Sequence, residues 1–384
     1  MLRAIKYELN PSKTQKEQIK QTCGCCRLVY NTMLDRKISA YKESGITISA
    51  IELINQLPQL KSELSFLKEV PSQALQQAIR NLDTAYTNFF RKGGSGFPKF
   101  KKKGVRDSFR IPVACTIDCD NWAIKVAKLG TVKFFKGHNK QINGKIKSYT
   151  ISRTSTDRYF ISVLYETEDR AKLNNNKSVG IDVGIKYFAV LSDGKVFESQ
   201  KYLKSNLKKL RVLQRSVSRK YQQGKKREEQ SNNWKKAAKQ VAKLQEHIAF
   251  QRYDYLHKVS TWISNNYSTV CVETLDVKCM QKNHHLAQSI SDCGWGMFLN
   301  MLEYKCDNLV KIDKWYASSQ TCSVCGHKEE KVKNLNVREW TCTECGTHHK
   351  RDLNAARNIE REGLSLCGLK VAEYCMLVPR TQLL

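Results

Sequence analysis

The sequence predicts a multidomain protein of mixed α+β and α/β class, in which β-rich modules alternate with long helices. Three observations lead to this expectation. A length of 384 residues suits two or three modules rather than one small domain. Short segments with alternating apolar and polar residues, typical of strands, occur in both halves of the chain. Between them lie longer stretches whose apolar residues recur every three or four positions, as they do in helices.

The first half has the pattern of a small β-barrel interrupted by helices. Residues 1–10 alternate as a strand, and residues 14–90 turn to helical periodicity. Residues 107–168 return to short strands separated by polar turns, which predicts a barrel. The opening strand can pair into this barrel, with the helices inserted between.

The second half begins with a meander of short strands over residues 179–197, turning at Asp193-Gly194. Two helical patterns, 199–222 and 232–265, follow as an antiparallel hairpin. The remaining elements that we expect are a buried strand at 268–274, a helix over 295–310, an extended segment at 311–317, a cysteine module at 320–347 and a last helix at 353–362.

The charge of the chain is strongly positive. There are 66 Lys and Arg residues against 36 Asp and Glu residues, which gives a formal net charge of +30. Such a surplus repels itself unless an anionic partner is bound, so nucleic acid or an acidic membrane is expected. We favour nucleic acid over a membrane, because no run of about 18 apolar residues occurs and the leucines of the 199–265 hairpin suit mutual packing.

Four cysteines have the spacing of a metal site. Cys322 and Cys325 form one CxxC pair, Cys342 and Cys345 form another, and a glycine follows each pair. Four thiolates on two tight turns can close a tetrahedron around one structural Zn²⁺. The alternative is two unrelated pairs or disulfides. We favour zinc because no export signal opens the chain, so that a reducing cytoplasm is expected.

Three acids form the second candidate site. Asp182 lies inside an apolar strand with a glycine two residues away on each side, and Glu273 has a similar strand setting. Asp352 opens the last helix. Taken singly, the strand acids could be salt-bridged and Asp352 could be an ordinary N-cap. Together, carboxylates from three separate segments can hold two Mg²⁺ ions about 4 Å apart, the arrangement that cleaves phosphodiesters.

Basic surface is concentrated in two places. Residues 91–103 form a glycine-rich basic loop with aromatic residues between the charges, and the 201–260 hairpin has basic polar faces. Any single lysine is explained as part of a solvated helix face, but the total surplus of positive charge is not. Both segments are candidates for following a phosphate backbone, with Phe97, Phe100 and Phe109 available for stacking.

At this point the residues resemble a known family. The segments Ile181-Asp182-Val183-Gly184-Ile185-Lys186, Val272-Glu273 and Arg351-Asp352-Leu353-Asn354-Ala355-Ala356 are similar to the three acid segments of a RuvC-type nuclease. Ser318-Ser319-Gln320-Thr321-Cys322 resembles the start of the zinc ribbon that precedes the third acid. With Gly96-Phe97-Pro98-Lys99-Phe100 and Ser289 to Trp295, the whole order resembles the TnpB family, the transposon-encoded relatives of type V CRISPR nucleases, to about residue 362.

The resemblance implies a domain layout. A wedge-like β-barrel would be split by a helical recognition insertion, and an RNase H-like (RuvC) domain would carry the zinc ribbon. The implied bounds are 1–12 and 91–170 for the wedge, 13–90 for the insertion, 177–317 and 348–364 for the RuvC-like domain, 318–347 for the ribbon and 365–384 for a tail.

The resemblance also implies an activity. The protein would bind a guide RNA from the transposon end, one protein per RNA, and cleave matching double-stranded DNA beside a short motif. Asp182, Glu273 and Asp352 would be the catalytic, Mg²⁺-binding acids. A prokaryotic, cytoplasmic and nucleoid-associated protein is expected. The residues expected to contact nucleic acid are Tyr41, Gln76, Lys99, Lys101, Lys102, Phe109 and Arg110.

Some positions depart from the family pattern. Ser72 and Gln73 replace a Lys-Phe pair near the DNA-motif reader, so the motif of a familiar member is not transferred. Lys350 stands where an additional Asp is common. Three other functions stay open: a nuclease-inactive RNA-guided repressor, a strand-transfer transposase and a miniature CRISPR effector. The intact acids disfavour the repressor, and the lack of an obvious end-binding domain disfavours the transposase.

Overall fold

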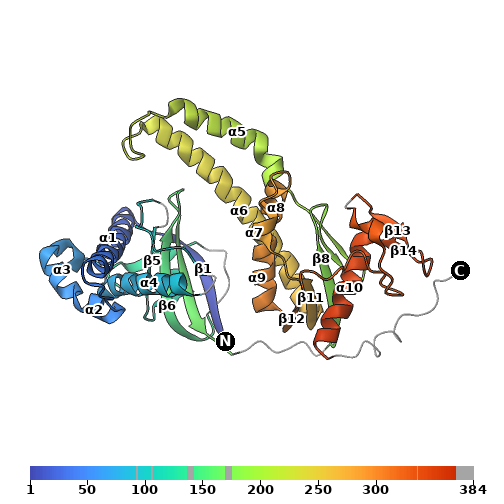
Figure 1. The fold of residues 1–384 in the computed structure, drawn as a ribbon. Helices are drawn as coiled ribbons and strands as arrows, with labels where there is room; N and C mark the ends of the chain where they lie inside the picture. Colours follow the sequence, from blue (N-terminus) through green and yellow to red (C-terminus); the bar gives the residue numbers. More distant parts are fainter. Residues whose placement is uncertain (92–93, 105–106, 136–141, 169–174, 335, 369–384) are drawn as a thin grey trace. The chain divides into compact units, whose positions relative to one another are not determined.

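The computed structural model describes residues 1–91, 94–104, 107–135, 142–168, 175–334 and 336–368. The chain forms two compact units, Met1–Arg170 and Ala171–Leu384. Each has its own sheet and its own hydrophobic core (Figure 1). The expected tail at 365–384 lies almost wholly outside the described residues.

Unit 1 contains a seven-stranded antiparallel sheet in the order β2-β6-β7-β1-β5-β4-β3. Its opening strand pairs with the later strands, as the sequence predicts, and lies in the middle of the sheet, between β7 and β5. The strands are β1 (Leu2–Asn10), β2 (Asp107–Ile111), β3 (Thr116–Asp118), β4 (Ala123–Val126), β5 (Gly130–Phe134), β6 (Lys145–Arg153) and β7 (Tyr159–Glu166).

The prediction of a closed barrel is wrong. The sheet ends at β2 and β3, and in the described residues no ladder joins these two strands. Closure needs a continuous ladder around the ring. β3 has only three residues, all paired with β4, and β1 shares eight residue pairs with β7 but only two with β5. Short strands can be recognised in a sequence, whereas the strength of each pairing cannot.

The helices of unit 1 stand between β1 and β2 in the chain, as expected. They are α1 (Lys13–Ser44), α2 (Ala50–Asn55), α3 (Leu57–Glu63), the 3-10 turn η1 (Ser65–Lys68) and α4 (Ser72–Phe90). A capping box of Ser12 and Gln15 starts α1, and Gly45 ends it with a φ of 66°. Apolar faces of α1 and α4 share one core cluster with the sheet.

Unit 2 is built on a five-stranded mixed sheet in the order β10-β9-β8-β11-β12. β8 (Ser178–Val183), β9 (Tyr187–Leu191) and β10 (Val196–Glu198) form the expected antiparallel meander. β11 (Thr269–Glu273) and β12 (Asn308–Ile312) then run parallel to β8.

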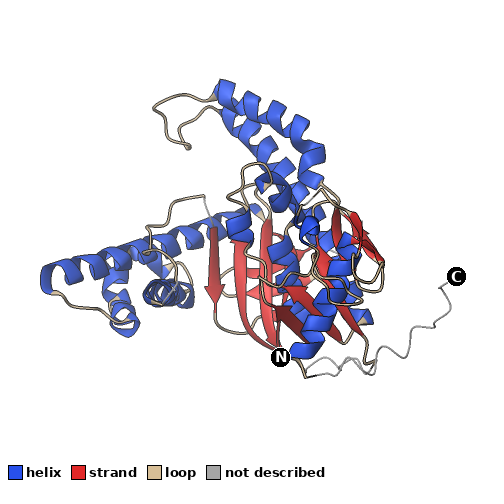
Figure 2. Cartoon of the chain, turned by 45° about the vertical axis from the view of Figure 1, so that its right-hand side comes forward, coloured by secondary structure: helices blue, strands red, loops and turns tan. Residues whose placement is uncertain are grey.

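Helices cover both faces of this sheet (Figure 2). α6 (Asn232–Asn266) and α9 (Trp295–Lys305) pack on the face that presents Val179, Ile181 and Val270. α10 (Arg351–Leu366) packs on the opposite face, against Cys271 and Ile312. The shorter helices α7 (Val277–Met280) and α8 (Ala287–Cys293) lie between β11 and α9 in the chain.

The helix expected over residues 295–310 is shorter than predicted. α9 ends at Lys305, and residues 308–312 form β12 instead. Residues 308–312, Asn-Leu-Val-Lys-Ile, have apolar residues that fit either periodicity. Pairing with β11 along its whole length decides for a strand.

The expected helical hairpin is present. α5 (Tyr202–Lys220) packs along α6 through Leu210, Leu244 and Ile248. Its base is fixed by Asp292, whose carboxylate accepts bonds from the N–H groups of Leu203 and Lys204. None of the helices in the described ranges combines the length and apolar character needed to cross a bilayer.

Candidate functional site

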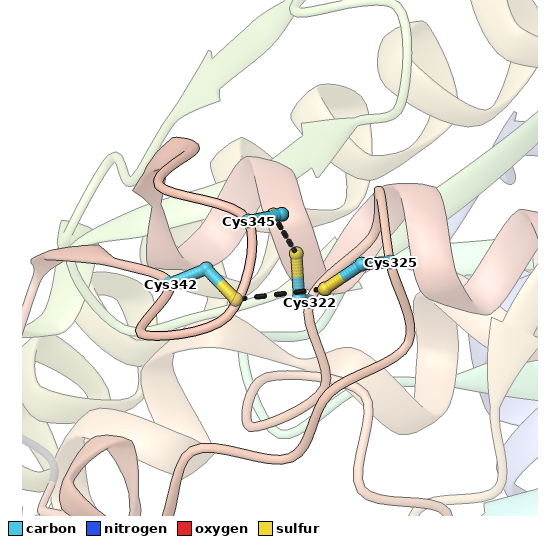
Figure 3. Close-up of side chains that lie close together, drawn as sticks. All are labelled: Cys322, Cys325, Cys342 and Cys345. Carbon is cyan, nitrogen blue, oxygen red and sulfur yellow. Dashed lines mark hydrogen bonds between the residues drawn. The ribbon is translucent and has the colours of Figure 1, made fainter.

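The four cysteines come together (Figure 3). All four sulfur atoms lie within 4.8 Å of one another. The distances are 3.7 Å between Cys322 and Cys345 and 3.6 Å between Cys325 and Cys342. Zinc–sulfur bonds of about 2.3 Å in a tetrahedron separate the sulfurs by about 3.8 Å. The four side chains therefore fit one zinc ion, and no disulfide links them.

Two equivalent turns produce this arrangement. The N–H of Gly326 donates to Cys322 O at 2.9 Å, and the N–H of Gly346 donates to Cys342 O at 3.0 Å. Both glycines have positive φ values, 81° and 68°, which residues with a Cβ rarely adopt. The ribbon also contains the 3-10 turn η2 (Glu330–Lys333) and the hairpin of β13 (Glu339–Thr341) and β14 (His348–Lys350).

The sheet register places Asp182 beside Glu273. β8 and β11 are parallel neighbours, with Gly180 opposite Cys271 and Ile181 opposite Val272. The next positions are Asp182 and Glu273, at the carboxyl ends of both strands. Because strand side chains alternate, these acids share the sheet face on which α10 lies.

Gly180 lets α10 approach this face closely. A Cβ on Gly180 would lie 2.0 Å from Ala356 O and 2.6 Å from Glu360 N. From this contact, Asp352 lies one helical turn back along α10, about 6 Å. Asp182 lies two residues forward along β8, about 7 Å. Because Ser178, at the start of β8, bonds to Glu360 farther along α10, the helix runs antiparallel to β8 and its start lies at the carboxyl end of that strand.

Asp352 is not the N-cap of its helix. α10 begins at Arg351, the N-cap is Lys350, and Asp352 occupies the first turn. A carboxylate there is favoured by the positive end of the helix dipole. The N-cap alternative for this acid is therefore excluded by the structure.

The three carboxylates influence one another electrostatically. Burial raises the pKa of Asp182 well above 3.8, and the negative charges of Glu273 and Asp352 raise it further. Arg351 and Arg338 oppose this shift only in part. Burial also raises the pKa of Glu273. Such a cluster is short of positive charge, and a divalent cation would supply it.

The acid oxygens are spread more widely than the cysteine sulfurs. Among the described residues, only the four cysteines form a group of three or more metal-ligating side chains with all ligand atoms within 4.8 Å. A two-metal site divides its ligands between ions about 4 Å apart, so its outer oxygens need not meet this limit. The donor set of three carboxylates fits Mg²⁺, which prefers oxygen ligands.

Several residues that the sequence did not single out join the ribbon to the acids. Ser318 Oγ donates to Glu273 Oε1 at 2.5 Å. Asn358, fully buried on α10, donates to the carbonyls of Ser318 and Thr321. Asn354 accepts from the N–H of Ser323 at 2.8 Å. The segment before the first cysteine is thus fixed to both Glu273 and α10. In the sequence, the available signal was the presence of Asn354 and Asn358 in the expected last helix, because an asparagine that becomes buried there needs a hydrogen-bond partner.

Two arginines adjoin the acids. The guanidinium of Arg338, just before β13, lies 3.7 Å from Asp352 Oδ1. Arg351 is buried and donates to Asn334 O at 2.7 Å, so it anchors the ribbon loop. Arg338 is too distant from the acids in sequence to be identified without the fold, and Arg351 stands next to Asp352 in the chain, but its anchoring contact with the ribbon loop is visible only in the structure.

Most of the expected nucleic-acid contacts are exposed on unit 1. Tyr41 is 65% exposed, and Gln76, Lys99, Lys102 and Arg110 are exposed as well. The Lys101 ammonium lies 3.8 Å from the ring centroid of Tyr30. Arg110 also donates to Ser148 Oγ at 3.1 Å.

The prediction that Phe109 contacts nucleic acid is wrong. Its side chain is only 4% exposed and belongs to the core cluster of unit 1. The ring lies on the core-facing side of β2, whereas Arg110 next to it faces out. A ring so buried is not available to stack on a base.

Comparison with known proteins locates the chain in a family. Its residues 162–284 match a model described as a probable transposase, residues 295–359 match the Cas12f1-like TNB domain, and residues 1–45 match a helix-turn-helix domain. A putative RNA-guided DNA endonuclease of Streptomyces pristinaespiralis is 38% identical over 375 residues, covering 95% of this chain and 91% of that protein. The putative RNA-guided DNA endonuclease InsQ of Escherichia coli K12 is 34% identical, covering 96% and 94%. The chain belongs to the TnpB family.

More distant TnpB relatives match along almost the same span. The TnpB-like protein L79 of Acanthamoeba polyphaga mimivirus is 24% identical, covering 94% of this chain and 73% of that protein. The N-terminal family model is described as helix-turn-helix, but here residues 2–44 are strand β1 followed by the single long helix α1.

Solved structures give weaker likenesses. The Cas12f1–sgRNA–target DNA complex matches with a TM-score of 0.35 and 16% identity, covering 94% of this chain and 99% of that one. The mini-RNA-guided endonuclease CRISPR-Cas_phi3 matches with a TM-score of 0.42 and 9% identity, covering 95% and 92%. At these scores the likeness does not by itself establish a shared fold.

Proposed function

We propose that this TnpB-family chain is a transposon-associated, RNA-guided DNA endonuclease that cuts target DNA beside a short motif. Relatives named as RNA-guided DNA endonucleases share more than a third of its residues over nearly its whole length. The observation that carries the proposal is the convergence of Asp182, Glu273 and Asp352 on one face of the unit 2 sheet. A binding protein has no need to gather three mutually repelling, partly buried carboxylates in one place.

The domain layout is part of the proposal. In unit 1 the sheet, residues 1–12 and 91–170, would be the wedge, and residues 13–90 the recognition insertion. In unit 2, residues 177–317 and 348–364 would form the RuvC-like nuclease domain, interrupted by the zinc ribbon at 318–347. The five-stranded sheet of unit 2, with β8 and β11 parallel and helices on both faces, supports the nuclease assignment.

Asp182, Glu273 and Asp352 would hold two Mg²⁺ ions as the catalytic acids. Bound there, the ions would activate a water molecule and stabilise the leaving oxygen of the cut phosphodiester. The chain's part is to hold the carboxylates. Ser318 fixes one oxygen of Glu273, and the sheet register fixes the spacing of Glu273 and Asp182.

The four cysteines would bind one structural Zn²⁺. With four protein sulfurs, the ion keeps no free position for substrate, so its role is to fold the ribbon. The ribbon in turn delivers Ser318 and Arg338 to the acids. Zinc would thus support catalysis through geometry.

Guide RNA and target DNA would use the basic surface. Base pairing would read the sequence, while the protein would hold the hybrid by its phosphates. One protein per RNA is the stoichiometry that we propose. Tyr41 and Gln76, exposed on α1 and α4, would lie near the adjacent motif, with Lys99, Lys101, Lys102 and Arg110 on phosphates.

The test is cleavage by the purified RNA–protein complex of guide-matched DNA, with and without Mg²⁺. Wild type should cut, Asp182→Ala should bind but not cut, and Asp254→Ala, at an exposed acid on α6, should cut as wild type does. Equal cutting by wild type and Asp182→Ala, or binding without any cutting by wild type, would overturn the proposal. The second result would indicate a repressor.

A further inference from the structure

A short loop lies on the rim of the acid site. The chain leaves β12 at Ile312, which pairs with Glu273 in the parallel ladder. It returns at Ser318, whose Oγ lies 2.5 Å from Glu273 Oε1. Both ends of residues 313–317 therefore adjoin Glu273. Trp315 is three residues from each end, so its backbone lies within about 10 Å of both.

The loop is held in place by its own contacts. Asp313 Oδ1 accepts from the N–H of Trp315 at 2.7 Å, and Asp313 O accepts from the N–H of Tyr316 at 3.3 Å. Tyr316 packs against the cluster of Cys271, Ile312 and Ile359 under α10. One aromatic residue thus anchors the loop, and the preceding one faces away.

Trp315 is 80% exposed, the highest value among the large hydrophobic side chains of the described chain. The Lys314 ammonium lies 4.6 Å from its ring centroid. Single exposed hydrophobic residues are common and do not by themselves indicate a binding site. The position of this one matters, because the loop that carries the indole and its neighbouring cation begins and ends at Glu273, one of the three acids that suit phosphodiester cleavage.

We propose that Trp315 is a positioning residue that stacks on an unpaired base of the DNA strand entering the acid site, with Lys314 near the adjoining phosphate. The inference rests on the proposed nuclease function and deepens it. Aromatic stacking with nearby cations is how proteins hold single strands without reading their sequence. Bases within a duplex are already stacked on each other, so the occupant is an unwound strand. Holding one base would fix the phosphate a few nucleotides away against the acids.

The first experiment measures single-turnover cleavage of guide-matched DNA by the RNA–protein complex. Trp315→Ala should slow cleavage of bound DNA by about 10- to 100-fold, and Trp315→Phe should restore most of the rate. The matched control is Tyr304→Ala. Tyr304 is 60% exposed, with Lys305 Nζ 5.9 Å from its ring, but α9 leads into the opposite end of β12. The Tyr304→Ala complex should cleave DNA at the wild-type rate, and all three variants should have the wild-type melting temperature.

The second experiment separates stacking from a structural effect. An abasic site is moved along each DNA strand. In wild type, one or two abasic positions near the cut should slow cleavage, and in Trp315→Ala the same positions should have no further effect. Target binding, measured in an Asp182→Asn background, should change less than cleavage.

The outcomes are distinguishable. If wild type does not cut guide-matched DNA, the nuclease function itself fails. If wild type cuts and Trp315→Ala cuts equally fast, the role of Trp315 is overturned while the nuclease stands. If Trp315→Ala is slow but abasic effects add to it in full, the residue acts through folding of the loop, and the stacking proposal is likewise overturned.

Discussion

Asp182 lies where burial and two neighbouring carboxylates oppose its ionisation. Its pKa in the folded chain is raised above the ordinary 3.8, so between these values the folded state binds more protons than the unfolded state. Stability of the metal-free protein should therefore fall as pH rises from about 4 through the raised pKa. The raised pKa of Glu273 acts in the same direction.

Asp182→Asn should remove part of this loss. Without Mg²⁺ at neutral pH, we expect the variant to be more stable than wild type by about 1–2 kcal/mol, or 2–4 °C in Tm per kcal/mol for a unit of this size. The gain should shrink near pH 4, and added Mg²⁺ should stabilise wild type but not the variant. Calorimetry in chelator-free buffer measures this, with Asp254→Asn as the exposed control. A loss of stability in the metal-free variant would contradict the electrostatic account.

Cys342 is buried among the four sulfurs. Cys342→Ser should lower bound zinc from one ion per chain to none and unfold the ribbon, because three thiolates bind far more weakly than four. Elemental analysis and limited proteolysis of residues 318–350 measure both effects. Cys279→Ser, at an exposed cysteine on α7, is the control. A folded, protease-resistant ribbon without zinc in Cys342→Ser would overturn the structural role of the metal.

At the scale of elements, the crossing of α10 over β8 brings Asp352 to Asp182. Gly180→Ala would push a methyl group into the backbone of α10. We expect a loss of about 1–3 kcal/mol or more in stability. The loss in DNA cleavage should be larger than that in RNA binding, since the acids move apart.

Gly296→Ala on α9 is the matched control for the α10 crossing. A Cβ there meets nothing within 4 Å, and alanine favours a helix over glycine by about 0.5–1 kcal/mol. Denaturant unfolding of both variants and their cleavage rates test the crossing. Equal stability of Gly180→Ala and wild type would show that the backbone of α10 does not lie against Gly180 of β8.

The sequence predicted most elements of unit 2, because their periodicity is strong. The β8–β10 meander and the α5–α6 hairpin match the expected segments within a few residues. The sequence assigned the first part of β12 to a helix, because the secondary structure of a short apolar segment depends on its neighbour, here β11. Phe109 was misjudged because alternation in a strand shows which residues share a face but not which face is buried.

At the scale of the molecule, the charge of +30 should make RNA binding strongly dependent on salt. Arg211, Arg215 and Arg219 line a shallow groove on α5. Replacing all three by Gln should reduce the slope of log K against log salt by about 2–3, if each neutralises one phosphate. Gln214→Ala, in the same groove but uncharged, should leave the slope unchanged. Binding titrations from low to moderate salt measure it, and an unaltered slope in the triple variant would remove the hairpin from the RNA interface.

The sequence by itself determined the chemistry available to this protein. It identified the three acids, the four cysteines and the excess of positive charge, because residue type, spacing and periodicity are local properties. The tertiary structure decided what these residues meet. The open sheet of unit 1, the burial of Phe109, the Ser318–Glu273 bond and the rim position of Trp315 depend on strand pairing and helix crossing. Such contacts join residues far apart in the chain, and only the packing of backbone against backbone, as at Gly180, fixes which of them touch.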